Sequence, residues 1–158
     1  MANVKAIPDG YHTITPAIVV KDAKRAIEFY ARAFGAQDRG IFTGPDGRIM
    51  HAELQIGNSI FMLMDEMPEM NAVSPTTLKN TTASLYLYVE NADAAFDRAV
   101  KAGATVKTPV ADMFWGDRCG TVIDPFGYQW SIAMHKEDLT PQEIRTRGEQ
   151  FFATQAKT

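Results

Sequence analysis

The sequence has 158 residues, of which 46% are hydrophobic and 22% are charged, and its formal net charge is −3. This length suits one domain or two small fused units, and the composition excludes the disordered and fibrous classes. The acidic balance, together with the lack of a basic run interleaved with aromatic residues, disfavours nucleic acid as a partner.

Cysteine content and hydropathy indicate the compartment. The single cysteine, Cys119, excludes an internal disulfide and a multi-cysteine metal cluster, and we interpret it as a small residue in a strand core. The N-terminal stretch MANVKAIPDGYH contains no apolar run of signal length, and nowhere are eighteen consecutive residues apolar. We therefore expect a cytoplasmic protein with no membrane partner.

The first half of the chain predicts a strand, a helix and three more strands. Residues 11–20 (YHTITPAIVV) are rich in β-branched residues, which favours a strand. Asp22 is placed to cap a helix whose apolar residues recur at the three-and-four spacing until Gly35. The next strands are expected at Gln37–Thr43, Ile49–Ile56 and Ser59–Met64, the last two joined by the hairpin signal Gly57-Asn58.

Residues 65–82 (DEMPEMNAVSPTTLKNTT) are rich in Met, Pro, Thr and Asn and show no period. A segment of this length without a period is typical of a lid or a mobile loop. Plain disorder is an equally good interpretation, and both stay open.

The pattern then starts again. A strand is expected at Ser84–Val89, and a second helix extends from the cap Asn91 to Gly103. The stretch VVKDAKRAIEFYARAFGA (19–36) matches YVENADAAFDRAVKAGA (88–104) at both caps and along the apolar stripe. Such a repeat predicts two like βαβββ modules. The remaining strands of the second copy are expected at Thr105–Val110, Arg118–Ile123 and Gln129–Ala133.

A last helix is expected after the second module. Thr140-Pro141-Gln142-Glu143 has the spacing of a capping box with proline at the first helical position. Gly148 leaves the far end of this helix open. We treat residues 136–158 as a C-terminal helical extension that packs on the domain or on another subunit.

The helix-entry pattern VxDAxxAxxFYxxxFGA, the turn DPFGYxW and the tandem modules resemble the vicinal oxygen chelate superfamily of glyoxalase I, bleomycin-resistance proteins and extradiol dioxygenases. The strings HAELQIGNSIFML, DMFWGDRCG and DPFGYQWSIAMHKEDLTP look most like its PhnB-like branch. The resemblance implies an α+β fold in which two tandem βαβββ modules form a U-shaped cleft. The single domain would span 7–135, with module one at 7–65, a lid-like loop at 65–82 and module two at 83–135.

Enzymes of this superfamily hold a divalent metal with His, Gln or Glu from the first and last strands of the modules. Carried over residue by residue, those positions fall on Thr15, Ser84, Ser131 and either Phe61 or Met62. None of these is a strong ligand for such a cation, so we expect no metal and no other cofactor.

A minority alternative places a divalent metal at His51 and Glu53, which alternate along one strand and share a face. Two ligands are too few for a tight site unless His12 or His135 joins them.

If the modules close as the resemblance implies, the cleft holds hydroxyls, one imidazole and one carboxylate, with an aromatic residue at its mouth. We predict a protein that binds a small organic molecule, as antibiotic-sequestering members of the superfamily do, and that forms a homodimer. The alternative is an enzyme of the lyase, isomerase or dioxygenase type, in which Glu53, with a raised pKa, and His51 act as an acid–base pair or as part of a metal site. The predicted ligand-binding residues are Thr13, Thr15, His51, Glu53, Ser84, Tyr86, Tyr88, Trp115, Gln129 and Ser131.

Overall fold

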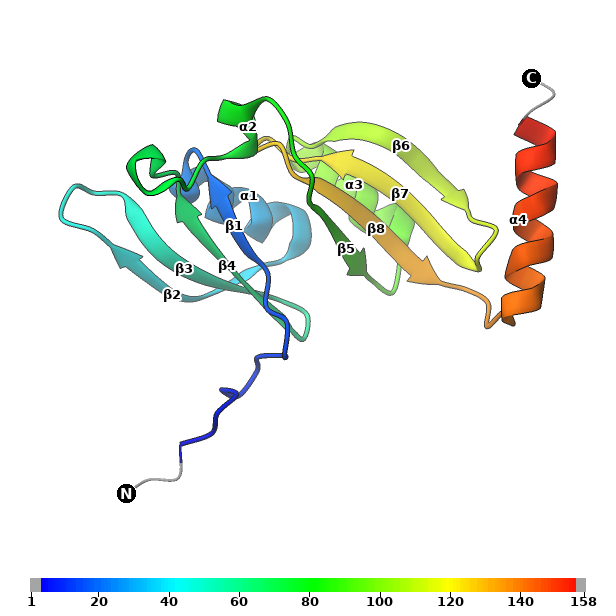
Figure 1. Ribbon diagram of the computed structural model, residues 1–158, viewed down its shortest axis with the longest axis horizontal. Helices are drawn as coiled ribbons and strands as arrows, with labels where there is room; N and C mark the ends of the chain where they lie inside the picture. Colours follow the sequence, from blue (N-terminus) through cyan, green and yellow to red (C-terminus); the bar gives the residue numbers. More distant parts are fainter. Residues whose placement is uncertain (1–3, 156–158) are drawn as a thin grey trace.

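The computed structural model describes residues 4–155, which form two four-stranded sheets backed by helices (Figure 1). The first module contains β1 (Ala17–Val20), α1 (Ala23–Phe34), β2 (Gln37–Thr43), β3 (Ile49–Ile56) and β4 (Ser59–Asp65). A connecting segment carries the short helices η1 (Pro68–Met70) and α2 (Pro75–Leu78). The second module and the extension contain β5 (Ser84–Tyr88), α3 (Ala92–Ala102), β6 (Thr105–Asp112), β7 (Asp117–Ile123), β8 (Gln129–His135) and α4 (Pro141–Gln155).

The two modules have the same topology. Their strand orders are β1-β4-β3-β2 and β5-β8-β7-β6, and in each the first strand runs parallel to the last. Ala17 pairs with Met62 in the first sheet, just as Tyr86 pairs with Ser131 in the second. The predicted α+β fold of two tandem βαβββ modules followed by a C-terminal helix is therefore confirmed.

The predicted caps explain where α1 and α3 begin and end. The side chains of Asp22 and Asn91 accept hydrogen bonds from backbone N–H groups in the first turns, as N-cap residues do. Gly35 and Gly103 end the helices with φ of 69° and 119°, a region that glycine enters without steric cost. Local sequence thus marks the ends of both helices.

One hydrophobic core joins the modules. Buried residues from α1, α3 and both sheets form a single cluster, in which the rings of Phe34 and Trp130 lie 4.6 Å apart. The two helices pack against each other, and Arg98 of α3 donates to the carbonyl of Ala33 of α1 at 2.8 Å. In Figure 1 both helices lie behind the sheets, so the opposite faces of the two sheets are open.

The first strand is shorter than residues 11–20, the predicted range. Ala17 is the first residue with a partner in β4, and the preceding segment makes local turns, in which the N–H of Tyr11 bonds to Pro8 and the hydroxyl of Thr15 to His12. Residues 11–16 are therefore not in a strand, although their composition favours one.

The segment 65–82 has regular structure that its composition does not predict. Glu66 accepts hydrogen bonds from the backbone and hydroxyl of Ser74 and from the hydroxyl of Thr77. Ser74 is fully buried and caps α2. These contacts fix the segment internally, and the N–H of Glu66 attaches it to the first module by donating to the carbonyl of Val20. Its predicted role as a lid stays a prediction.

The C-terminal helix begins at the predicted capping box, in which the carboxylate of Glu143 accepts from the N–H and hydroxyl of Thr140. It does not end at Gly148 but continues to Gln155, while residues 156–158 of the predicted extension lie outside the described part of the chain. A Cβ at Gly148 would lie 3.2 Å from the ring of Phe114, so glycine lets the helix approach that ring closely. Figure 1 shows α4 at the far end of the second sheet.

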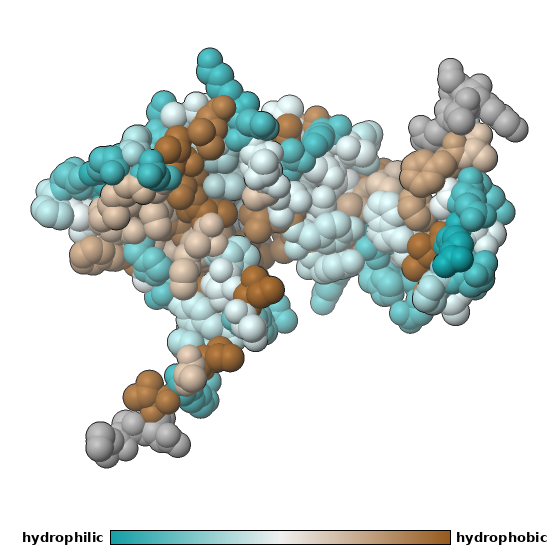
Figure 2. Space-filling view, viewed as in Figure 1, coloured by the Kyte–Doolittle hydropathy of each residue, from teal (hydrophilic) through white to brown (hydrophobic). Residues whose placement is uncertain are grey.

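The open faces of the two sheets differ in character. Figure 2, which views both, shows apolar residues over the first sheet and a paler, more polar surface over the second. Cys119 lies buried in β7, which confirms its interpretation as a strand residue. No helix within residues 4–155 combines the length and hydropathy needed to cross a membrane.

Candidate functional site

The open face of the first sheet carries His51 and Glu53 of β3. Their side chains lie 3.1 Å apart, and Glu53 also accepts a hydrogen bond from the hydroxyl of Tyr11. Tyr11, followed by His51, lowers the pKa of Glu53 below its usual value. This is the opposite of the raised pKa predicted for an acid–base role, because the expected dry cleft is absent and two donors stabilise the carboxylate.

The other predicted residues of the first module lie ahead of β1. Thr13 is exposed, and Thr15 bonds to the carbonyl of His12. The ring of His12 lies 3.3 Å from the carbonyl of Asn58, away from His51 and Glu53. His12 therefore adds no third ligand to that pair.

The register identifies the last-strand position of the first module. Met62 pairs with Ala17 and Glu53, so it is the counterpart of Ser131, and it shares the open face with Glu53. Phe61 points the other way, into the core, where its ring meets that of Trp130.

The four positions at which the superfamily holds a metal are thus Thr15, Met62, Ser84 and Ser131. Three of these side chains carry hydroxyls and the fourth is a thioether, and neither group binds a hard or borderline divalent cation strongly. Among residues 4–155, no three His, Cys, Asp or Glu side chains are grouped so that they can share an ion. The donor set does not fit the superfamily's metal, and the expectation of no metal stays a prediction.

The open face of the second sheet carries a different cluster, built around Asp117 at the start of β7. Its carboxylate accepts from the hydroxyls of Tyr86 and Tyr88 at 3.3 and 2.9 Å and from the indole N–H of Trp115 at 3.2 Å. It also lies 2.9 Å from Nδ1 of His135. We call Tyr86, Tyr88, Trp115 and Asp117 the aromatic platform.

The platform combines exposed rings with a buried carboxylate. Tyr86 and Tyr88 are 50% and 61% exposed, whereas Asp117 is only 4% exposed. Burial raises the pKa of Asp117, but hydrogen bonds from His135, Tyr88, Trp115 and Tyr86 outweigh it, so the pKa lies below its usual value. The pKa of His135 is raised by Asp117 and then by Asp138, whose carboxylate lies 3.0 Å from Nε2.

The remaining predicted residues of the second module lie beside the platform on the same sheet. Ser131 and Thr121 are 3.2 Å apart through their hydroxyls, and Ser84 is exposed opposite Gln129 in β8. Gln129 accepts a hydrogen bond from Lys107 at 2.6 Å.

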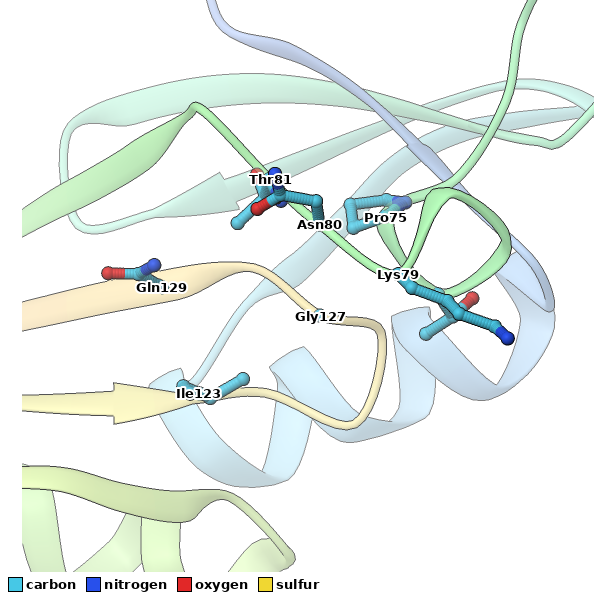
Figure 3. Close-up of a pocket in the computed structure, with 8 residues that line it drawn as sticks. Pro75, Lys79, Asn80, Thr81, Ile123, Gly127 and Gln129 are labelled. Carbon is cyan, nitrogen blue, oxygen red and sulfur yellow. The ribbon is translucent and has the colours of Figure 1, made fainter.

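Gln129 also lines a pocket of about 310 Å³ between α2 and the start of β8. Figure 3 shows Pro75, Lys79, Asn80 and Thr81 on one side of it and Ile123 and Gln129 on the other. A Cβ at Gly127 would lie 2.9 Å from the Cβ of Pro75, so glycine permits the close approach of α2 to this turn.

The predicted site residues therefore fall into two groups on two sheets. Thr13, Thr15, His51 and Glu53 belong to the first module, and the rest belong to the second. In the structure α1 and α3 pack together behind the sheets. That these residues line one cleft stays a prediction.

Two residues of the platform region were not predicted as site residues. Asp117 stands next to Arg118 in the sequence, which suggests an ion pair between them, but Arg118 points to the other face and pairs with Asp93 and Asp112 at 2.6 and 3.0 Å. His135 was considered only as a partner of His51. The predicted turn at DPFGY is the sequence signal that brings Asp117 and His135 together. A hairpin that pairs Ile123 with Gln129 across this turn also pairs Asp117 with His135.

Comparisons with known proteins agree with the fold. A profile of the Glyoxalase/Bleomycin resistance protein/Dioxygenase superfamily matches residues 11–132, and the chain belongs to this superfamily. The resemblance inferred from the sequence motifs is thereby confirmed.

Similar proteins are found in bacteria and plants. The chain is 43% identical to the uncharacterised protein Rv0887c of Mycobacterium tuberculosis over 135 residues, which cover 84% of this chain and 79% of that protein. Among solved structures, TioX from Micromonospora sp. ML1 has a TM-score of 0.63 at 26% identity, covering 78% of this chain and 98% of TioX. A PhnB protein from Bacillus cereus, 19% identical over 78% of this chain and 99% of its own, shares the fold with a TM-score of 0.60.

Proposed function

We propose that the chain binds a small organic molecule on the aromatic platform, without a metal. One observation carries this proposal. Tyr86 and Tyr88 are each half exposed or more, and yet both hydroxyls are held in place because they donate to Asp117. Exposed aromatic rings with a polar anchor are typical of surfaces that contact organic ligands.

Fixing the rings before binding favours affinity. A free tyrosine side chain loses rotamer freedom when a ligand immobilises it, at a cost of about 0.5–1.5 kcal/mol for a mobile side chain. On the platform this loss occurs on folding, because each tyrosine is tied to the same buried carboxylate. The corresponding positions of the first module, Ala17 and Val19, offer no rings, so the two open faces are not equivalent.

Binding alone is sufficient for a protective function. A protein that holds an antibiotic keeps it from its target with no chemical step, and the superfamily profile that matches this chain includes bleomycin resistance proteins. The enzymatic alternative at His51 and Glu53 is less well supported, because the lowered pKa of Glu53 makes that carboxyl a poor proton donor near neutral pH.

We propose in addition that the active form is a homodimer. Both open faces lack a cover within residues 4–155, and a second copy would place the His51 and Glu53 face of one chain over the platform of the other. This arrangement would unite the two groups of predicted residues in one cleft.

A thermal-shift screen tests the binding proposal. Oxygen-rich and aromatic antibiotics, bleomycin included, would be compared on the parent, on the double variant Tyr86→Leu, Tyr88→Leu and on the control Val100→Ala, which removes exposed apolar atoms from α3 behind the sheets. A ligand at a hundred times its Kd stabilises the folded state by about 2.7 kcal/mol, which is a readily measured rise in Tm. We expect a compound that raises the Tm of the parent and of Val100→Ala but not of the double variant. If compounds stabilise all three proteins equally, or none stabilises the parent, the proposal is wrong.

A further inference from the structure

The hydroxyls of the platform are already engaged, which limits what a ligand can contact. Tyr86 and Tyr88 donate to Asp117, and the indole N–H of Trp115 does the same. The rings of Tyr86 and Tyr88 have their centroids 5.1 Å apart and their planes tilted by 45°. What they offer to a ligand is therefore mainly their π faces and edges.

A negative charge lies at the hydroxyl ends of these rings. Asp117 is 4% exposed and is contacted by all three aromatic side chains. Hydrogen bonding of a phenol to a carboxylate increases the electron density of the ring, and the π face of an aromatic ring already attracts cations. The carboxylate and the ring quadrupoles thus act in the same direction.

The positive groups near the platform are paired with acids. Arg118 is held by Asp93 and Asp112, and Lys136 by Asp112, so these four charges balance. His135 lies between Asp117 and Asp138, and even when it is protonated these two carboxylates leave one negative charge in excess. Within residues 4–155, the cations beside Asp117 are therefore all paired with acids, whereas Lys107, which has no acid partner, bonds to Gln129 at the opposite end of β8 from His135.

Resting on the proposed function, we propose that the ligand of this face is an organic cation, with a quaternary or substituted ammonium group set against Tyr86 and Tyr88. The rest of the ligand would lie along the hydroxyl-bearing surface at Thr121 and Ser131, which follows the platform on the same sheet. The positive charge of the ligand and its contact with the tyrosine rings, rather than directed hydrogen bonds, would determine which molecule binds.

Three molecules of similar shape but different charge test this inference: choline, its neutral carbon analogue 3,3-dimethylbutan-1-ol, and the anion 3,3-dimethylbutanoate. Kd values would be measured from NMR shifts of the tyrosine ring resonances. A cation–π contribution of 1–2 kcal/mol corresponds to about a tenfold preference. We expect choline to bind about tenfold more tightly than the neutral analogue and the anion to bind most weakly.

Variants of the two tyrosines separate the contribution of the ring to binding from that of the hydroxyl. The Tyr86→Phe and Tyr88→Phe variants keep the π face and should retain the preference for choline in large part, whereas Tyr86→Leu, Tyr88→Leu should lose it. The Val100→Ala control, on the helix α3 behind the sheets, should behave like the parent. The inference is overturned if the neutral analogue binds the parent as tightly as choline, if choline causes no shift, or if the preference survives in the double leucine variant.

The outcomes also separate this inference from the proposed function. If antibiotics bind through the tyrosines but choline shows no preference over its neutral analogue, the inference fails and the proposed function stands. If no organic molecule in either experiment depends on the tyrosines, both fail.

Discussion

Asp117 gathers four side-chain partners at the start of β7, and its role depends on how these groups share one carboxylate. Tyr86, Tyr88 and Trp115 donate to it, and His135 approaches it from the paired strand β8. Because Asp117 is buried, it cannot exchange these partners for water without cost. The carboxylate therefore positions the platform, while the rings are the parts that a ligand would touch.

The pairing of Asp117 with His135 makes stability depend on pH. Asp117, followed by Asp138, raises the pKa of His135 above its usual value of 6.5. A histidine with a higher pKa in the folded state stabilises the fold below the unfolded value, and this contribution is lost as the pH rises through the folded pKa. Since the pKa of Asp117 is lowered, its carboxylate stays ionised throughout that window.

We therefore expect the His135→Gln variant to lose more unfolding free energy, relative to the parent, at about pH 5.5 than at about pH 9. Urea denaturation at both pH values measures the difference. His12→Gln is the matched control, because the ring of His12 contacts a backbone carbonyl of Asn58. An equal loss for His135→Gln at the two pH values would contradict the assigned pairing.

Single residues show what the sequence could and could not predict. Tyr86, Tyr88 and Trp115 were predicted as ligand contacts from their alternation on a strand and their place in a loop, and the structure brings them together. Their common partner was missed because Asp117 stands next to Arg118, and the strand geometry that sends neighbours to opposite faces was not applied to that pair.

At the level of elements, α1 is attached to the β7–β8 turn by a buried polar contact. The hydroxyl of Tyr30 donates to Asp124 at 2.7 Å, and Asp124 also accepts from the indole of Trp130 and from the backbone of Phe126 and Tyr128. Asp124 is 3% exposed, and its burial raises the pKa of this carboxyl. The contact joins a helix of the first module to a turn of the second.

The Tyr30→Phe variant should be less stable than the parent by about 1–3 kcal/mol, because it leaves a buried carboxyl without one of its donors. Chemical denaturation gives the free energy of unfolding. Tyr88→Phe is the control, since it removes a hydroxyl from an exposed tyrosine that also bonds to an aspartate, and we expect it to lose less. Similar losses in the two variants would show that burial of the Tyr30 side chain is not what makes the contact important.

Elements whose signals are local were predicted well. The caps at Asp22 and Asn91 and the repeat of the βαβββ unit need only a few neighbouring residues to be recognised. The first strand was predicted too long because its length depends on where β4 provides partners. The structure of the segment 65–82 was missed for a similar reason, since Glu66 and Ser74 bind each other across residues that show no period.

At the level of the whole molecule, the packing of α1 against α3 decides where a ligand can bind. The two helices are in contact behind the sheets, and the predicted site residues of the two modules belong to different sheets. The fold could be predicted from repeated local patterns, but this relation between the modules depends on side chains that meet across the shared core.

Backbone-amide NMR of the full chain, titrated with a compound that raises its melting temperature, tests the location of the site most directly. Binding at the aromatic platform predicts the largest shifts in β5, β7 and β8, around Tyr86, Asp117 and His135. Largest shifts around His51 and Glu53 in β3, or at the pocket beside α2 with none at Tyr86 and Tyr88, would contradict it.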